Sequence, residues 1–150
     1  MNAFPDTSFL CSLYRKQIYS PRAIVFMDKA TEPLPVTTLL LLEFRQSTRL
    51  QTRLHDRDKT RGFSNQEANA MLQHLQNDLS AGVFEMVVVD WAEAHLLAES
   101  LSAKHTRGHG HRMVDILHVA TALHLGASKF LTFDDNQKML AEAEGLAMAV

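Results

Sequence analysis

The stretch that decides the fold of this chain is residues 111–135, HRMVDILHVATALHLGASKFLTFDD. Its first half predicts a helix, because apolar residues recur at three- and four-residue steps up to Gly126, where a helix end is expected. Its second half, residues 129–133, predicts a short buried strand that ends at two aspartates. A helix, a glycine-containing loop and a buried strand make half of a βαβ unit, and ligands bind at the carboxyl edge of such sheets. Asp115, which opens the helix, and Asp134, which ends the strand, are therefore candidates for one site.

Composition indicates one globular domain over residues 1–150. The 150 residues are 46% hydrophobic and 21% charged, which suits a chain with a sizeable core. The single cysteine, Cys11, excludes an internal disulfide framework and favours a reducing, cytoplasmic location. No apolar run reaches membrane-spanning length, and the first residues lack the pattern of a secretion signal, so no membrane partner is expected.

Strand and helix signals alternate along the whole chain. Their order predicts an α/β protein, a three-layer sandwich with a mostly parallel sheet and helices on both faces. Strands are expected near residues 2–5, 34–37, 83–89, 129–133 and 146–150. Helices are expected near residues 9–14, 22–30, 39–54, 64–80, 91–103, 113–124 and 136–144.

Four acidic residues are expected to lie together at the carboxyl edge of this predicted sheet. Asp6 follows the first strand, Glu43 lies in the helix after the second, Asp115 opens the helix before the fourth, and Asp134 ends that strand. Each aspartate alone is also explained as a helix cap or a first-turn acid. Four clustered carboxylates, however, raise one another's pKa unless a cation joins them. Oxygen ligands without cysteine indicate Mg²⁺ or Mn²⁺, either of which can activate water against a phosphodiester.

Three segments carry a family resemblance. PDTSFL, LLLLEFRQS and MVDILHVATALHLGASKFLTFDDNQ together resemble the PIN-domain ribonucleases, and most of all the VapC-type toxins of bacterial toxin–antitoxin pairs. The resemblance covers nearly the whole chain. It implies a five-stranded parallel sheet, Mg²⁺- or Mn²⁺-dependent cleavage of single-stranded or structured RNA, a cognate antitoxin protein, and frequent homodimers.

The resemblance also assigns residues. The family's acidic positions, which serve both catalysis and metal binding, fall on Asp6, Glu43, Asp115 and Asp134. Ser8 matches a polar position that supports the first acid. Asp135 competes with its neighbour, and Asp134 is preferred because the predicted strand ends there.

Two basic patches suit a polyanionic partner. Residues 45–61 hold six basic and two acidic side chains, and residues 102–112 hold three basic side chains and no acid. Arg45, Arg49 and Arg53 recur at four-residue steps, which places them along one side of a helix. With Arg107 and Arg112 they are predicted to contact RNA or an antitoxin, although a solvated helix face would show the same pattern.

Other enzyme classes fit less well. A haloacid dehalogenase-type phosphatase needs a second acid at position 8, which is Ser8, and a receiver domain would not place its central acid, Glu43, within a helix. The stronger alternative is a catalytically inactive PIN-like module that binds RNA or protein.

The histidines leave one further alternative open. Residues 105–111, HTRGHGH, could form a transition-metal site, but a mobile basic loop beside the active edge is the preferred interpretation. His118 and His124 lie on the predicted helix and are interpreted as packed or surface residues.

Overall fold

The computed structural model describes residues 2–150 and contains five short parallel strands and seven helices. The strands are β1 (Ala3–Pro5), β2 (Leu34–Val36), β3 (Phe84–Met86), β4 (Lys129–Leu131) and β5 (Ala147–Met148). The helices are α1 (Thr7–Tyr14), α2 (Ser20–Lys29), α3 (Thr38–Arg57), α4 (Asn65–Ser80), α5 (Trp91–His109), α6 (Met113–His124) and α7 (Asp135–Ala143). None of the helices within residues 2–150 is long and apolar enough to cross a membrane.

The strands do not form the single five-stranded sheet that the family resemblance implied. They pair as a three-stranded sheet in the order β1-β4-β5 and a two-stranded sheet of β2 and β3. β1 lies beside β2, but the two sheets are not joined by a hydrogen-bonded ladder. Pro5 in β1 and Pro35 in β2 each lack an amide donor, and this weakens any ladder between these two short strands.

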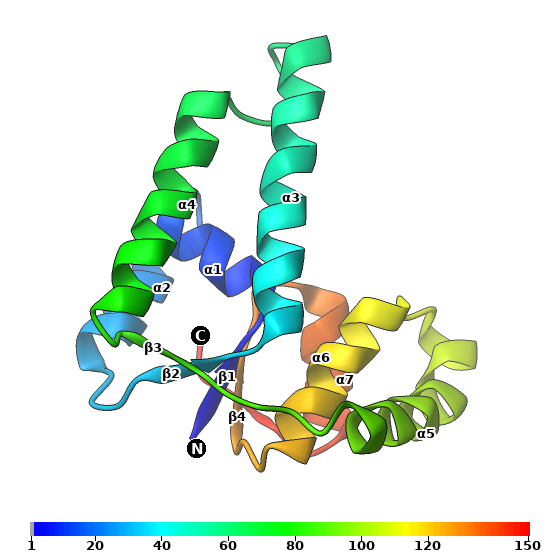
Figure 1. The fold of residues 1–150 in the computed structure, drawn as a ribbon. Coiled ribbons are helices and arrows are strands. Elements are labelled where there is room, and N and C mark those ends of the chain that lie inside the picture. Colours follow the sequence, from blue (N-terminus) through cyan, green and yellow to red (C-terminus); the bar gives the residue numbers. More distant parts are fainter. Residues whose placement is uncertain (1) are drawn as a thin grey trace.

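Helices cover both faces of the strands, as the sequence predicted (Figure 1). Successive side chains of a strand point to opposite faces, and β1 shows this directly. Ala3 belongs to the hydrophobic core that includes residues of α1, α2, α3 and α4, whereas Phe4 belongs to the core that includes residues of α5, α6 and α7. The Phe4 ring stacks on that of Phe130 from β4, with centroids 6.2 Å apart. The two cores are therefore separated by the strands, which gives the three-layer sandwich.

Helices α3 and α4 form a hairpin that extends beyond the rest of the molecule (Figure 1). The Thr37 hydroxyl accepts a hydrogen bond from the Leu40 amide and so begins α3. α4 begins at the predicted capping box, in which Ser64 and Glu67 bond each other's backbone amides. The predicted arginine stripe lies on α3 and is thus carried on the protruding part of the fold.

All five predicted strands are shorter in the structure, and the strand predicted at residues 146–150 is reduced to Ala147–Met148. Residues 83–89 form a strand only at Phe84–Met86, and residues 129–133 only at Lys129–Leu131. After β4 the backbone forms hydrogen bonds with side chains instead of with a neighbouring strand. The Phe133 amide, for example, donates to the Ser8 hydroxyl at 2.8 Å. This early end of the strand brings Thr132 and Asp134 toward the first aspartate.

The prediction of a mobile loop at residues 105–111 was wrong. α5 continues to His109 instead of ending near residue 103, and Gly110 ends it in the left-handed conformation with φ +70°. The Glu144 carboxylate accepts hydrogen bonds from Lys104 at 2.7 Å and from His105 at 2.5 Å. These contacts with the end of α7 hold the last turns of α5 in a helix that the local sequence, rich in glycine, does not predict.

Candidate active site

The four predicted acids come from four segments that meet near the carboxyl ends of β1, β2 and β4. Asp6 directly follows β1 and caps α1, and Asp134 follows β4 by three residues and caps α7. Asp115 lies in the first turn of α6, and Glu43 lies in the second turn of α3. The cap interpretation is therefore correct for Asp6 and Asp134, and it coexists with their place at this edge.

Asp6 is fully buried and held by three hydrogen bonds. Its Oδ1 accepts from the Ser8 hydroxyl at 2.7 Å and from the Phe9 amide at 2.9 Å, and its Oδ2 accepts from the Thr132 hydroxyl at 2.6 Å. Burial raises the pKa of Asp6 to about 6, although these hydrogen bonds favour its ionised form. The effect of burial on the pKa thus outweighs that of the hydrogen bonds. Too little positive charge lies near Asp6 to offset its removal from water.

Asp134 is tied to Asp6 through one threonine. The Thr132 hydroxyl, which donates to Asp6, accepts a hydrogen bond from the Asp134 amide at 3.0 Å. The Asp134 Oδ1 accepts from the Gln137 amide at 3.0 Å, as an N-cap residue does. Asp135 is exposed in the first turn of α7 and has no such connection to the described residues.

Asp115 is almost completely buried, and its partner is an arginine of its own helix. The Arg112 Nε and Nη2 donate to the two Asp115 oxygens at 2.8 and 2.9 Å, a bidentate ion pair. This bond raises the pKa of Arg112, and the charges of Asp134 and Glu43 act on it in the same direction. One guanidinium group therefore lies within electrostatic reach of three of the four acids.

Gln137 joins two of the acids from α7. Its backbone amide donates to the N-cap carboxylate of Asp134, and its side-chain Nε2 donates to Asp115 Oδ1 at 3.3 Å. The other side-chain atom, Oε1, is buried and has no hydrogen-bond partner among residues 2–150. An orphaned buried oxygen among carboxylates marks a place where a donor or a cation would be stabilised.

Glu43 is held by two other helices. The Thr7 hydroxyl from α1 and the His118 Nε2 from α6 both bond Glu43 Oε2, the latter at 2.6 Å. Burial alone would raise the pKa of Glu43, but the hydrogen bonds from His118 and Thr7 outweigh it and lower the pKa. Glu43 is thus kept ionised, and its side chain is 27% exposed.

The donor set suits a hard divalent cation, because it consists of carboxylate, amide and hydroxyl oxygens. The side chains of these acids, however, are too far apart to surround an ion. Within residues 2–150, no three His, Cys, Asp or Glu side chains converge closely enough to hold a metal. The Arg112 guanidinium instead neutralises Asp115, where the sequence predicted a metal ligand.

The same finding applies to the alternative transition-metal site. The His111 ring lies 6.4 Å from His105 and 5.8 Å from His109, centroid to centroid. His105 is bonded to Glu144, and the described histidines form no three-ligand group. The pKa of His111 is lowered, chiefly by burial and then by the other two histidines. Residues 105–109 of this segment form the last turns of α5.

The predicted basic residues divide between the site and the surface. Arg112 lies at the acids, as described above. Arg49, Arg53 and Arg107 are exposed, Arg45 is partly buried, and among residues 2–150 no carboxylate pairs with any of these four. Their guanidinium groups remain available to an anionic partner.

Sequence reasoning missed four side chains that organise the acids: Thr7, His118, Thr132 and Gln137. Two of them carried a usable signal. His118 stands three residues after Asp115 and Gln137 three residues after Asp134, so each shares a helix face with a predicted acid. His118 was interpreted as a packed residue, which is correct for its burial and incomplete for its contact with Glu43.

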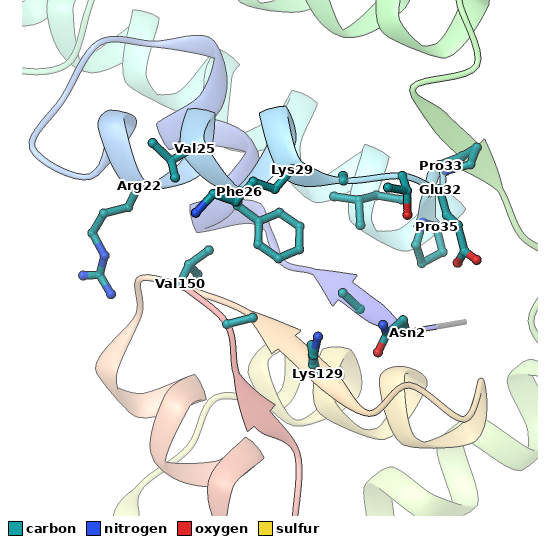
Figure 2. A pocket seen from close by; sticks show the side chains of 15 residues that line it. Asn2, Arg22, Val25, Phe26, Lys29, Glu32, Pro33, Pro35, Lys129 and Val150 are labelled. Carbon is teal, nitrogen blue, oxygen red and sulfur yellow. The ribbon is translucent and has the colours of Figure 1, made fainter.

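A cavity of about 890 Å³ lies away from the acids, at the amino-terminal ends of β1, β2 and β4. Figure 2 shows Phe26 projecting from α2 toward the sheet across this space. The basic residues Arg22, Lys29 and Lys129 line it with one acid, Glu32. It holds none of the predicted site residues.

Comparisons with known proteins concern the family and the fold of this chain. The family model described as PIN domain matches residues 3–143. The crystal structure of FitAcB from Neisseria gonorrhoeae is similar, with a TM-score of 0.63 and 17% sequence identity over 97% of this chain and 95% of that chain. At that identity the similarity concerns the fold. No curated protein matches the chain.

Proposed function

Because this chain belongs to the PIN-domain family, we propose that it is a divalent-metal-dependent endoribonuclease that cleaves phosphodiester bonds of single-stranded RNA. PIN domains are generally nucleases, which supports a hydrolase. The observation that carries the proposal is the gathering of acids from four segments at the edge where α/β sheets bind ligands.

Asp6, Glu43, Asp115 and Asp134 would hold Mg²⁺ or Mn²⁺. The raised pKa of buried Asp6 and the orphaned Oε1 of Gln137 both support a missing positive charge at this edge. When bound, the cation would supply Lewis acidity that activates water and offsets charge on the phosphate.

The protein's own residues have separable roles in this proposal. Ser8 and Thr132 orient Asp6 by hydrogen bonds to its two oxygens. Arg112 neutralises Asp115 in the metal-free protein, and its side chain is 72% exposed, so it can turn toward an RNA phosphate. The exchange of a carboxylate for a phosphate suits the planar guanidinium, which binds either group through two donors.

The arginines of α3 supply a path for the flanking RNA. Arg45, Arg49 and Arg53 begin two residues after Glu43 and continue along the protruding hairpin. Arg107 on α5 would extend the basic surface. Contacts of this kind fix the position of the backbone and are largely independent of base sequence.

The resemblance to VapC-type toxins supports a role as the toxin of a bacterial toxin–antitoxin pair. The proposal includes a cognate antitoxin that covers the basic surface, a homodimer, and action in the cytoplasm. A small neighbouring gene for a DNA-binding protein, and copurification of its product with this chain, test the antitoxin.

Replacement of Asp115 by Asn tests the nuclease directly. We expect RNA cleavage in Mg²⁺ or Mn²⁺ by the wild-type protein, no cleavage in EDTA, and loss of cleavage in Asp115→Asn. Because the partner Arg112 is largely exposed, the variant leaves no buried unpaired charge and should keep its fold and melting temperature. Full activity in a folded variant would contradict the proposed site.

A catalytically inactive PIN-like module that binds RNA or protein is the second candidate. The bidentate pair of Arg112 with Asp115 favours it, since a permanent ion pair would replace the metal. Calorimetric titration with Mn²⁺ separates the two functions. RNA binding without Mn²⁺ binding or cleavage would support the inactive module.

A further inference from the structure

His118 is a fully buried polar side chain near the acids that the proposed chemistry does not use. It is 0% exposed in the middle of α6, between Leu117 and Val119, both of which are buried. Its only hydrogen bond within residues 2–150 joins Nε2 to Glu43 Oε2 at 2.6 Å. The other ring nitrogen, Nδ1, is buried and has no partner in the described part of the chain.

This environment argues against a purely structural role. A buried polar atom without a partner costs on the order of 1–3 kcal/mol, and a leucine at this position would fill an apolar helix core without that cost. The imidazole is therefore not explained by packing. Its one polar contact, with Glu43, is the feature that accounts for a histidine here.

The contact fixes one carboxylate oxygen and leaves the other free. Thr7 from α1 and His118 from α6 both bond Oε2 of Glu43, which itself belongs to α3. Within the described chain, no group donates to Oε1. Two donors on one oxygen, from two different helices, leave the carboxylate little freedom to rotate.

We propose that His118 is a positioning residue for Glu43, whose Nε2–H holds the carboxylate so that its free oxygen faces the other acids. The inference rests on the proposed nuclease, because it assigns Glu43 as a ligand of the divalent cation. The imidazole would orient a carboxylate that binds the metal. The loss of such an orienting hydrogen bond typically lowers metal affinity or activity about 10- to 100-fold.

Two substitutions distinguish positioning from packing. His118→Leu fills the space and cannot donate, whereas the amide of His118→Gln can place an N–H near the position of Nε2. For wild type and both variants we would measure Mn²⁺ affinity by calorimetry, kcat and KM for RNA cleavage, and the melting temperature. We expect His118→Leu to lose about 10- to 100-fold in Mn²⁺ affinity and in kcat, with KM nearly unchanged, and His118→Gln to recover most of the loss.

A double-mutant cycle with Glu43→Ala tests whether His118 acts through Glu43. Once Glu43 is removed, His118→Leu should cause no further loss of Mn²⁺ affinity. Equal losses in the leucine and glutamine variants, or an additive loss in the double variant, would overturn the proposal.

Crystal structures of metal-free wild type and His118→Leu make the test independent of the nuclease. We expect the Glu43 carboxylate to leave its place beside Thr7 in the variant, and an unmoved carboxylate would overturn the proposal. A wild-type protein without RNA cleavage or Mn²⁺ binding would refute the proposed function instead, and the carboxylate position would then decide the role of His118.

Discussion

Replacement of the buried Asp6 by Asn should stabilise the metal-free protein at neutral pH. Burial raises the pKa of Asp6 from 3.8 to about 6, so between these values the folded chain keeps a proton that the unfolded chain has lost. Stability therefore falls as pH rises through this window and stays low above it. At about 1.36 kcal/mol per pKa unit, the penalty above pH 6 is about 3 kcal/mol.

The asparagine variant avoids this penalty because it has no charge to bury. Its side-chain oxygen can still accept from the Phe9 amide, and its NH₂ group can donate to the Thr132 hydroxyl, which serves as donor or acceptor. The free energy of unfolding of Asp6→Asn relative to wild type should therefore rise by up to about 3 kcal/mol between pH 4 and pH 7.

Urea denaturation in EDTA across this pH range measures the difference. Subtraction of the wild-type curve removes the titration of all other groups, and Asp135→Asn, which replaces an exposed acid, is the control. A difference for Asp6→Asn that does not change with pH would refute the argument that burial controls this carboxyl group.

The hairpin of α3 and α4 gives two further predictions. Gly62 has φ +60°, and a Cβ there would lie 2.1 Å from the Gln51 carbonyl oxygen, whereas Gly82 has φ +74° and open space around it. In urea denaturation Gly62→Ala should therefore cost at least about 1 kcal/mol more than Gly82→Ala, and equal costs would contradict the close approach. Replacement of Arg49 and Arg53 by Ala should weaken RNA binding for all sequences and reduce the slope of log affinity against log salt by about 1.4, or two phosphate contacts on a single strand. Replacement of the two basic residues of α2 should leave the slope unchanged, and an unaltered slope in the α3 variant would place these arginines off the RNA path.

Local patterns in the sequence determined where most elements begin and which residues could carry chemistry. A capping side chain acts within three residues of its own helix, so Ser64 and Glu67 are enough by themselves to predict the start of α4. The same locality placed Asp6 after a strand and Asp115 in a first helical turn. Alternating apolar and polar periods then predicted the α/β order, with helices on both faces.

The lengths of the elements depended on partners elsewhere in the chain. α5 continues past residue 103 because Glu144, 40 residues after Lys104, bonds its final turns. β4 ends at Leu131 because Ser8 and Asp6 bond the residues that follow it. Local propensity contains no information on these contacts, since tertiary bonds can outweigh it.

The internal order of the acid cluster was decided by tertiary structure alone. Glu43 and His118 lie 75 residues apart, and nothing in either local sequence predicts that they meet at 2.6 Å. The pKa of Asp6 is likewise set by complete burial, a property of the packed fold. Sequence determined which carboxylates are available at this edge, because that depends on local order along the chain. Only folding decided which donors hold them and how far water is excluded, because those effects act between segments brought together from across the chain.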